Sequence, residues 1–243
     1  MKPAGGLEPV VRLRKVTKIF GTKGRRTAAL NRVSLEIRRG EFVLVLGPSG
    51  SGKTTLLTLM AGLQPPTSGN IWIFGKRTTD CTPEQRQRLR ASRIGFIFQN
   101  FHLLEALPVL DNVMLVMKFC GIPRKERKQR AMAVLDEFGI AHLAAESPRI
   151  LSQGEKQRVA IARALANNAE LIMADEPTAC LESGQGLQII QSLSGHVKNR
   201  DCCAVVVSHD PRIAAFADRI LYLSDGKLRE TGNGRILSGD VLR

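Results

Sequence analysis

Long apolar runs are missing from this sequence of 243 residues. A helix needs roughly 20 consecutive apolar residues to cross a bilayer, and no stretch approaches that length. The first six residues, Met1 to Gly6, also lack the apolar segment of a signal peptide. These absences disfavour a membrane-embedded chain and predict a soluble protein located in the cytoplasm.

Paired cysteines and aromatic residues are scarce as well. The five cysteines show no C-x-x-C spacing and no histidine at metal-ligand spacing, which predicts reduced, structural thiols. Aromatic residues make up 5% of the chain and do not alternate with basic residues. This pattern disfavours binding of single-stranded nucleic acid, because such proteins stack bases on aromatic side chains.

Acidic residues are outnumbered by basic ones. There are 36 lysines and arginines against 22 acids, which gives a formal net charge of +14. Nucleotide phosphates, an acidic membrane face and nucleic acid would all suit this charge, and charge alone does not choose among them. The most basic segment, residues 123–130, has the composition of a solvated helix face.

A glycine-rich segment between two apolar runs carries the strongest functional signal. Phe42–Leu46 precede it and Leu56–Ala61 follow it, so we expect a buried strand, a tight turn and a buried helix. The pattern G-x-x-x-x-G-K-[ST] is that of a phosphate-binding loop, in which main-chain N–H groups converge on phosphate oxygens. Lys53 would reach the β- and γ-phosphates, and the Thr54 hydroxyl would ligate Mg²⁺. The expected nucleotide-binding loop comprises Gly47, Pro48, Ser49, Gly50, Ser51, Gly52, Lys53, Thr54 and Thr55.

A second apolar run, Leu171–Ala174, ends in the carboxylates of Asp175 and Glu176. Such a run predicts a buried parallel strand, and open α/β sheets bind ligands at the carboxyl ends of their strands. Asp175 is suited to hold Mg²⁺, directly or through water. Glu176 is suited to polarise the water that attacks the γ-phosphate.

A third apolar run, Val205–Val207, precedes Ser208, His209 and Asp210. One interpretation is that Ser208 or Asp210 only caps the next helix. In the other, the His209 ring donates a hydrogen bond toward the γ-phosphate and orients Glu176.

The segment Leu151–Glu155 opens an alanine- and arginine-rich helix and allows two interpretations. Ser152 and Glu155 match a capping box, which is a purely structural device. An exposed serine, the Gly154 N–H and the helix N-terminus would also form a second anion site. A single chain does not easily bring this segment onto its own phosphate loop, whereas a second copy packed head to tail does.

The order of the predicted elements indicates an α/β fold with two additions. The segments Val10–Phe20 and Val33–Ile37 alternate as strands of an antiparallel sheet beside the phosphate loop. Residues 100–145 read as helices, and strands and helices alternate again after Leu171. We therefore predict a mixed sheet core with an antiparallel β subdomain and an inserted helical subdomain.

Taken together, these motifs resemble those of the nucleotide-binding subunit of ABC transporters, from about Val10 to Thr231. The phosphate loop corresponds to the Walker A motif and residues 171–176 to Walker B with its catalytic glutamate. Residues 151–155 correspond to the family signature L-S-G-G-Q. The resemblance implies a P-loop NTPase fold of the ABC ATPase type, formed by residues 1–243 as a single domain, with a helical subdomain at about 100–165.

Further motifs fit the same family. Gln99 corresponds to the Q-loop glutamine, residues 177–182 to the D-loop and His209 to the switch histidine, while Phe20 stands where an aromatic ring stacks on adenine. The resemblance implies ATP hydrolysis with Mg²⁺ held by Thr54, Gln99 and Asp175. The residues implied to act in trans are Ser152, Gln153, Gly154 and Glu155.

Within the family, the chain resembles lipoprotein-release, macrolide-export, FtsE and heterocyst-glycolipid-export ATPases. The resemblance lies in residues 47–53, 94–101, 111–113 and 157–165. It implies a homodimer with two ATP molecules at its interface and a separate membrane subunit that docks near Gln99–Leu110. It also implies a peripheral position on the cytoplasmic face of the plasma membrane, and a role in export or lipid extraction.

Two motifs depart from the family pattern. The signature carries Gln153 in place of glycine and Glu155 in place of glutamine, so a carboxylate would lie near the incoming phosphate. We expect ATP turnover to persist with altered affinity. The D-loop has Ala179 near its usual serine and ends in Glu182 in place of aspartate, which would loosen communication across the dimer.

Two alternatives to transport stay open at this point. An FtsE-like protein would regulate a membrane or cell-wall complex without moving a substrate, and the sequence does not separate this role from export. A soluble ABC ATPase acting on nucleic acid would suit the basic charge. Such proteins usually carry two nucleotide domains or large inserted arms, so we expect no nucleic-acid partner.

Overall fold

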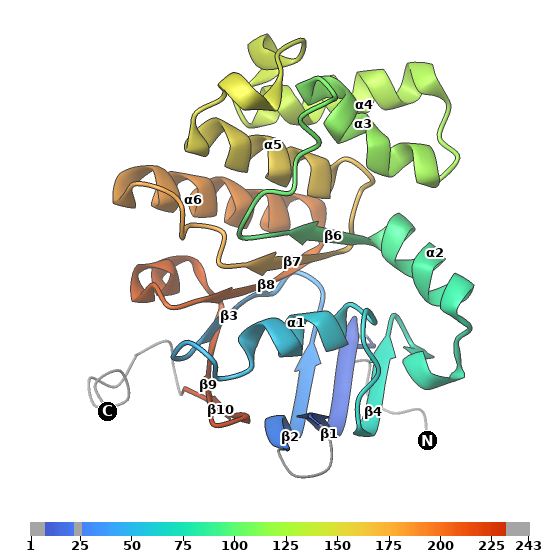
Figure 1. Ribbon diagram of the computed structural model, residues 1–243, viewed down its shortest axis with the longest axis vertical. Coiled ribbons are helices and arrows are strands. Elements are labelled where there is room, and N and C mark those ends of the chain that lie inside the picture. Colours follow the sequence, from blue (N-terminus) through green and yellow to red (C-terminus); the bar gives the residue numbers. More distant parts are fainter. Residues whose placement is uncertain (1–7, 22–25, 232–243) are drawn as a thin grey trace.

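Two β-sheets with a helix between them form the lower half of the molecule in Figure 1. The computed structural model describes residues 8–21 and 26–231. The strands are β1 (Val11–Phe20), β2 (Thr27–Ile37), β3 (Phe42–Leu46), β4 (Ser68–Ile73), β5 (Lys76–Arg77), β6 (Ile94–Ile97), β7 (Leu171–Asp175), β8 (Cys203–Ser208), β9 (Arg219–Ser224) and β10 (Lys227–Glu230). The helices are α1 (Lys53–Met60), α2 (Pro83–Arg93), α3 (Val109–Phe119), α4 (Arg124–Glu137), α5 (Gln153–Leu165) and α6 (Ser183–Arg200).

The larger sheet has six strands in the order β10-β9-β3-β8-β7-β6. Strands β6, β7, β8, β3 and β9 run parallel, and β10 pairs antiparallel with β9. The parallel strands are almost wholly apolar because both faces of the sheet are covered. Side chains alternate along each strand: Val43 and Val45 pack on the α1 side, whereas Phe42, Leu44 and Leu46 face the opposite layer of helices.

The smaller sheet is antiparallel, with the strand order β2-β1-β4-β5. Helix α1 lies between the two sheets and contacts β7 and β8 on one side and β1, β2 and β4 on the other. The predicted antiparallel sheet beside the phosphate loop is therefore confirmed, and so is the mixed sheet core. Strand β2 is longer than the sequence pattern indicated, since it begins at Thr27.

Helices α3, α4 and α5 pack against one another above the larger sheet, and α6 lies between them and the strands (Figure 1). Their apolar faces share one cluster with the upper face of the sheet, including Val113, Leu135 and Ile161. The helices predicted within residues 100–145 are confirmed as α3 and α4. The expected helix after His209 is a 3₁₀ helix, Pro211–Phe216, whose first turn Asp210 caps and whose only buried side chain is Ile213. One buried side chain is too little apolar surface to stabilise a longer α-helix.

Two expectations drawn from absences can be compared with the structure. In the described parts of the chain, no helix combines the length and the apolar character needed to cross a membrane. All five cysteines are free thiols. Burial raises the pKa of Cys202 to about 11, so this thiol stays protonated at neutral pH, as expected of a structural cysteine.

Candidate active site

The turn between β3 and α1 depends on glycine at two close approaches. Gly52 caps α1 with a left-handed backbone (φ 105°), and a Cβ atom there would lie 2.3 Å from the carbonyl oxygen of Ala29. A Cβ atom on Gly47 would lie 2.1 Å from the carbonyl oxygen of Leu223. Since neither main-chain oxygen can move freely, only glycine fits, and the loop wraps tightly around the N-terminus of α1.

Lys53 is buried at the first turn of α1 with 7% of its surface exposed. Its Nζ atom donates hydrogen bonds to the carbonyl oxygens of Gly47 (2.8 Å) and Pro48 (3.0 Å). The same atom lies 3.7 Å from Oε1 of Glu176. The ammonium group is therefore fixed inside the loop.

Thr54 and Asp175 come together across the end of the sheet. The Thr54 hydroxyl donates a hydrogen bond of 3.2 Å to Oδ1 of Asp175. Burial raises the pKa of Asp175, the nearby Glu176 carboxylate raises it further, and the hydroxyl and Lys53 oppose this. The hydroxyl and the carboxylate are hard oxygen donors of the kind that bind Mg²⁺. The residues present therefore fit this ion, provided that water and phosphate oxygens complete its shell. Within residues 8–21 and 26–231, no group of three or more His, Cys, Asp or Glu side chains forms a self-sufficient metal site.

Glu176 is held by three donors at the end of the neighbouring strand β8. Its Oε2 accepts hydrogen bonds from the Ser208 hydroxyl (3.1 Å) and the His209 main-chain N–H (3.2 Å), and it lies 2.9 Å from Nδ1 of the His209 ring. Glu176 also has a left-handed backbone (φ 48°), which costs on the order of 1–3 kcal/mol and is common at active sites. The carboxylate is thus oriented before any substrate arrives.

The structure separates the two interpretations of the segment after β8. Asp210 caps the 3₁₀ helix through a bond from the Arg212 N–H to its Oδ1 (3.0 Å). Ser208 instead donates its hydroxyl proton to Glu176 and accepts a bond from the Asp210 N–H (3.1 Å). From its sequence position, Ser208 was predicted only as a possible cap. The parallel register that pairs Asp175 with Val207 is the signal that would have placed Ser208 beside Glu176.

Phe20 and Gln99 lie at the margins of this cluster. Phe20 ends β1, is 43% exposed, and has the Lys18 ammonium 5.1 Å from its ring centroid. Gln99 follows β6 as an exposed residue, and its main-chain oxygen accepts a bond from the Cys180 thiol. In the described part of the chain, the hydrogen bonds of the Thr54 and Asp175 side chains do not include Gln99.

The segment Ser152–Glu155 is a complete capping box at the start of α5. The Ser152 N–H (2.8 Å) and hydroxyl (2.7 Å) both donate to Oε2 of Glu155, whose N–H donates back to the hydroxyl. These bonds lower the pKa of Glu155, which stays charged at neutral pH. Gln153 and Gly154 follow in the first turn of the helix.

The structure does not bring this segment to the phosphate loop of the same chain. The apolar residues of α1 belong to the cluster on one face of the larger sheet, and those of α5 belong to the cluster on the other face. Figure 1 shows α6 and the strands between the two helices. One chain therefore presents two separate candidate anion sites.

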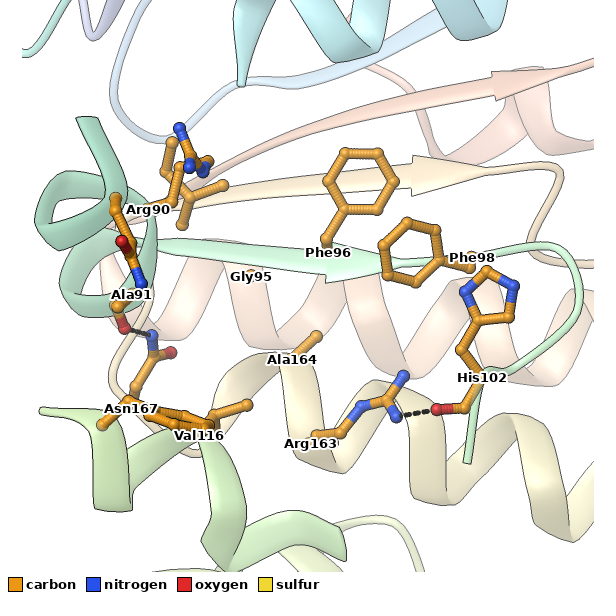
Figure 2. Close-up of a pocket in the computed structure, with 13 residues that line it drawn as sticks. Arg90, Ala91, Gly95, Phe96, Phe98, His102, Val116, Arg163, Ala164 and Asn167 are labelled. Carbon is orange, nitrogen blue, oxygen red and sulfur yellow. Dashed lines mark hydrogen bonds between the residues drawn. The ribbon is translucent and has the colours of Figure 1, made fainter. Parts of the chain in front are cut away.

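A cavity of about 440 Å³ lies between β6, α2, α3 and α5 (Figure 2). Phe96 and Phe98 stack in its wall with ring centroids 4.3 Å apart, and the His102 ring lies 4.7 Å from that of Phe98. At the cavity's edge, Arg163 of α5 donates hydrogen bonds to the carbonyl oxygens of Phe101 and His102. This cavity could not be predicted from local patterns, because its wall is built from several separate segments.

Comparisons with known proteins agree with this geometry. A family profile described as "ABC transporter" matches residues 30–179. The putative hemin import ATP-binding protein HrtA of Staphylococcus haemolyticus is 39% identical over 218 residues, which cover 90% of this chain and 98% of that protein. The macrolide export ATP-binding/permease protein MacB of Hyphomonas neptunium is 38% identical over 227 residues, which cover 93% of this chain and 35% of that protein.

A solved structure resembles the whole described fold. It is the dimeric structure of a post-hydrolysis state of the ATP-binding cassette MJ0796, bound to ADP and Pi. It superimposes with a TM-score of 0.85 at 40% sequence identity, and covers 93% of this chain and 100% of that chain.

Proposed function

The chain belongs to the ABC transporter family as an ATP-binding and ATP-hydrolysing subunit, and we propose that Lys53, Thr54 and Asp175 hold MgATP while Glu176 acts as the general base. Lys53 binds the β- and γ-phosphates, and Glu176 takes a proton from the attacking water. Thr54 and Asp175, with Gln99 as a further ligand, would hold the Mg²⁺ ion, which when bound would supply positive charge to the phosphate oxygens. The observation that carries this assignment is the set of three donors around Oε2 of Glu176, which leaves Oε1 available to water once Lys53 turns to the phosphates.

His209 and Phe20 have supporting roles in this proposal. His209 orients Glu176 and senses the γ-phosphate. Phe20 stacks on adenine, and its exposed ring at the end of β1 supports that role. Residues 1–243 form a single nucleotide-binding domain, with residues of about 100–165 as its helical subdomain.

The active form is a homodimer with two ATP molecules at its interface. The placement of α1 and α5 on opposite faces of the sheet supports this, because Ser152 to Glu155 then serve the phosphate loop of a second copy. The dimeric cassette with ADP and Pi gives the precedent.

A membrane subunit docks near Gln99–Leu110. The cavity of Figure 2 supports this position because it opens beside that segment and has an apolar wall. Phe119 at its edge is 73% exposed, and an apolar side chain of this size is commonly covered by a partner. The chain itself lies on the cytoplasmic face of the membrane.

The process driven by ATP is export or lipid extraction. The MacB relative is named for macrolide export, whereas the HrtA relative, at a similar sequence identity, is named for hemin import. An FtsE-like regulatory role, without transport, is the alternative, and identifying the membrane protein that co-purifies with the chain decides between them. No nucleic-acid partner is proposed. Retention on DNA or RNA with a steep salt dependence would contradict this.

Mixing two inactive variants tests the shared site. Lys53→Ala removes the phosphate-loop cation, and Ser152→Ala removes the signature hydroxyl, so each homodimer has two defective sites. A mixed dimer pairs the intact loop of one chain with the intact signature of the other, and we expect ATP hydrolysis to reappear on mixing. The control replaces the second partner with the double variant Lys53→Ala/Ser152→Ala. Two variants that stay inactive when mixed, despite forming mixed dimers, would refute the shared site.

A further inference from the structure

The outer face of the antiparallel sheet carries a basic hollow that the ATP site does not use. Its volume is about 840 Å³, and it is formed by β1, β2 and β4. The cationic side chains of Arg14, Lys15 and Arg32 line it, and none of the described residues in its wall is acidic. Three cations without a neighbouring carboxylate create a positive potential that attracts anions.

An irregularity in β1 collects these charges on one face. The pairing of β1 shifts register between Leu13 and Val16 on the β2 side and between Arg14 and Thr17 on the β4 side. Arg14 and Lys15 are consequently both exposed, although neighbouring residues of a regular strand point to opposite faces. Lys15 and Arg32 both have left-handed backbones, with φ of 49° and 52°.

The uncharged polar side chains of the hollow can donate hydrogen bonds to a ligand. The Ser34 hydroxyl oxygen accepts a bond from the Lys15 N–H (3.0 Å), and the Thr17 hydroxyl oxygen accepts one from the Arg32 N–H (3.1 Å). Since each oxygen is used as an acceptor, each hydroxyl proton remains available to a ligand. The side-chain oxygen of Asn70 accepts a hydrogen bond from Nε of Arg77 (3.0 Å). Its amide NH₂ group is therefore the part of the side chain that can donate to a ligand.

We propose that this hollow is a second anion site, which binds phosphate groups, separate from the ATP site. Cations and hydroxyl donors without acidic residues suit the acceptor-only oxygens of a phosphate. Its volume falls in the range of pockets that hold small organic ligands, so an oligophosphate or a phosphorylated headgroup fits better than a single phosphate ion. Occupancy of this site would explain part of the net charge of +14.

The single tryptophan of the chain gives a direct probe of this site. The Arg14 guanidinium lies 5.6 Å from the ring centroid of Trp72, so an anion that draws Arg14 into the hollow changes the fluorescence of that ring. We would titrate pyrophosphate into the full chain carrying Lys53→Ala, which removes the cation of the phosphate loop. We expect a saturable change. The additional substitution Arg32→Asn should weaken binding about tenfold, since one charged donor is lost and asparagine tolerates the left-handed backbone.

A matched control and a lipid measurement complete the test. Lys227→Gln removes an exposed cation from the other sheet and should leave the affinity for pyrophosphate unchanged. Vesicles containing phosphatidic acid, with neutral-lipid vesicles for comparison, identify the source of the phosphate group. If the chain binds these vesicles but not pyrophosphate, and Arg32→Asn abolishes the vesicle binding, the hollow holds a lipid headgroup. No saturable binding of either probe, or equal weakening by Arg32→Asn and Lys227→Gln, overturns the proposal.

Discussion

Lys53 Nζ lies 3.7 Å from Glu176 Oε1, so the cation proposed to bind phosphate and the carboxylate proposed to activate water face each other. Only 8% of the Lys53 side chain and 13% of the Glu176 side chain are exposed. An entering γ-phosphate would take Lys53 as its partner and leave Oε1 of Glu176 facing the water behind the phosphorus atom. The pair therefore holds both side chains in place until the substrate arrives.

Replacing Glu176 by glutamine should separate ATP binding from hydrolysis. The amide cannot take a proton from water, so we expect turnover to fall on the order of 10²–10⁴-fold while ATP still binds. The variant should accumulate as an ATP-bound dimer, visible as a doubled mass by size-exclusion chromatography with light scattering. ADP is the control, and it should leave the variant monomeric. A variant that stays monomeric with ATP would show that the general base is misassigned.

Asp175→Asn should raise stability and abolish magnesium-dependent hydrolysis. Burial raises the pKa of Asp175. A carboxyl group whose pKa is higher in the folded than in the unfolded state contributes to stability at a pH below its unfolded-state pKa. That contribution is lost as the pH rises through the folded-state pKa. At neutral pH the wild-type protein therefore contains a disfavoured charge, which asparagine removes while still accepting the bond from Thr54. We expect an increase in Tm of about 1–3 °C at pH 7, after discounting for partial exposure.

The pH dependence of this effect provides the control. At a pH low enough to protonate Asp175, the Tm difference between wild type and Asp175→Asn should vanish, because both side chains are then neutral. A lower Tm for the variant at pH 7 would mean that the charge itself holds the site together.

Local patterns were sufficient to predict the glycine-rich loop before α1 and the two carboxylates at the carboxyl end of β7. Lys53 and Glu176 are 123 positions apart, yet each directly follows a strand or turn that the sequence marks clearly. Because parallel strands end at one edge of a sheet, their proximity follows from the strand predictions. The antiparallel sheet and the helical layer were likewise marked by alternation and by apolar helix faces.

What the sequence did not indicate depends on strand register and on packing between distant segments. Ser208 donates to Glu176 because β7 and β8 align Asp175 with Val207, and a shift of one residue would turn it away. The shift in β1 that exposes both Arg14 and Lys15 has no glycine or proline within β1. The glycine at this point is Gly69 on β4, where a Cβ atom would lie 2.4 Å from the Lys15 carbonyl oxygen, and only the strand pairing brings the two together. The cavity of Figure 2 forms where α2 and β6 meet α3 and α5, and α5 is far from the other three elements in the sequence.

Glu155→Gln should strengthen the interaction with ATP. In the proposed dimer this carboxylate faces the phosphates of the nucleotide bound to the second copy, and like charges repel. Glutamine still caps α5 through its side-chain oxygen, so the helix start is preserved. We expect the KM for ATP to fall about two- to fivefold with little change in Tm. Glu126→Gln, which neutralises a half-exposed carboxylate paired with Arg130 on α4, is the control for a general change of charge. A higher KM would show that Glu155 contributes to ATP binding.

Arg163 should position the segment that follows Gln99. Its guanidinium donates to the carbonyl oxygens of Phe101 and His102, both of which have left-handed backbones (φ 57° and 49°). Asn112 holds the same segment further along, through its bond to the Leu104 N–H (2.7 Å). The side chain of Arg163 thus ties α5, which begins with the signature, to the proposed docking segment.

Arg163→Lys should release the first of these two attachments. Lysine keeps the charge but cannot form the two-pronged contact, and the loss should cost about 1–2 kcal/mol. Amide hydrogen exchange at residues 101–103 should rise about tenfold, and stimulation of ATP hydrolysis by the co-purified membrane subunit should weaken, while basal hydrolysis changes less than twofold. Arg158→Lys, which alters a contact between α5 and the Phe138 carbonyl, is the matched control. If exchange rises equally throughout α5 in Arg163→Lys, the arginine supports the helix rather than the segment after Gln99.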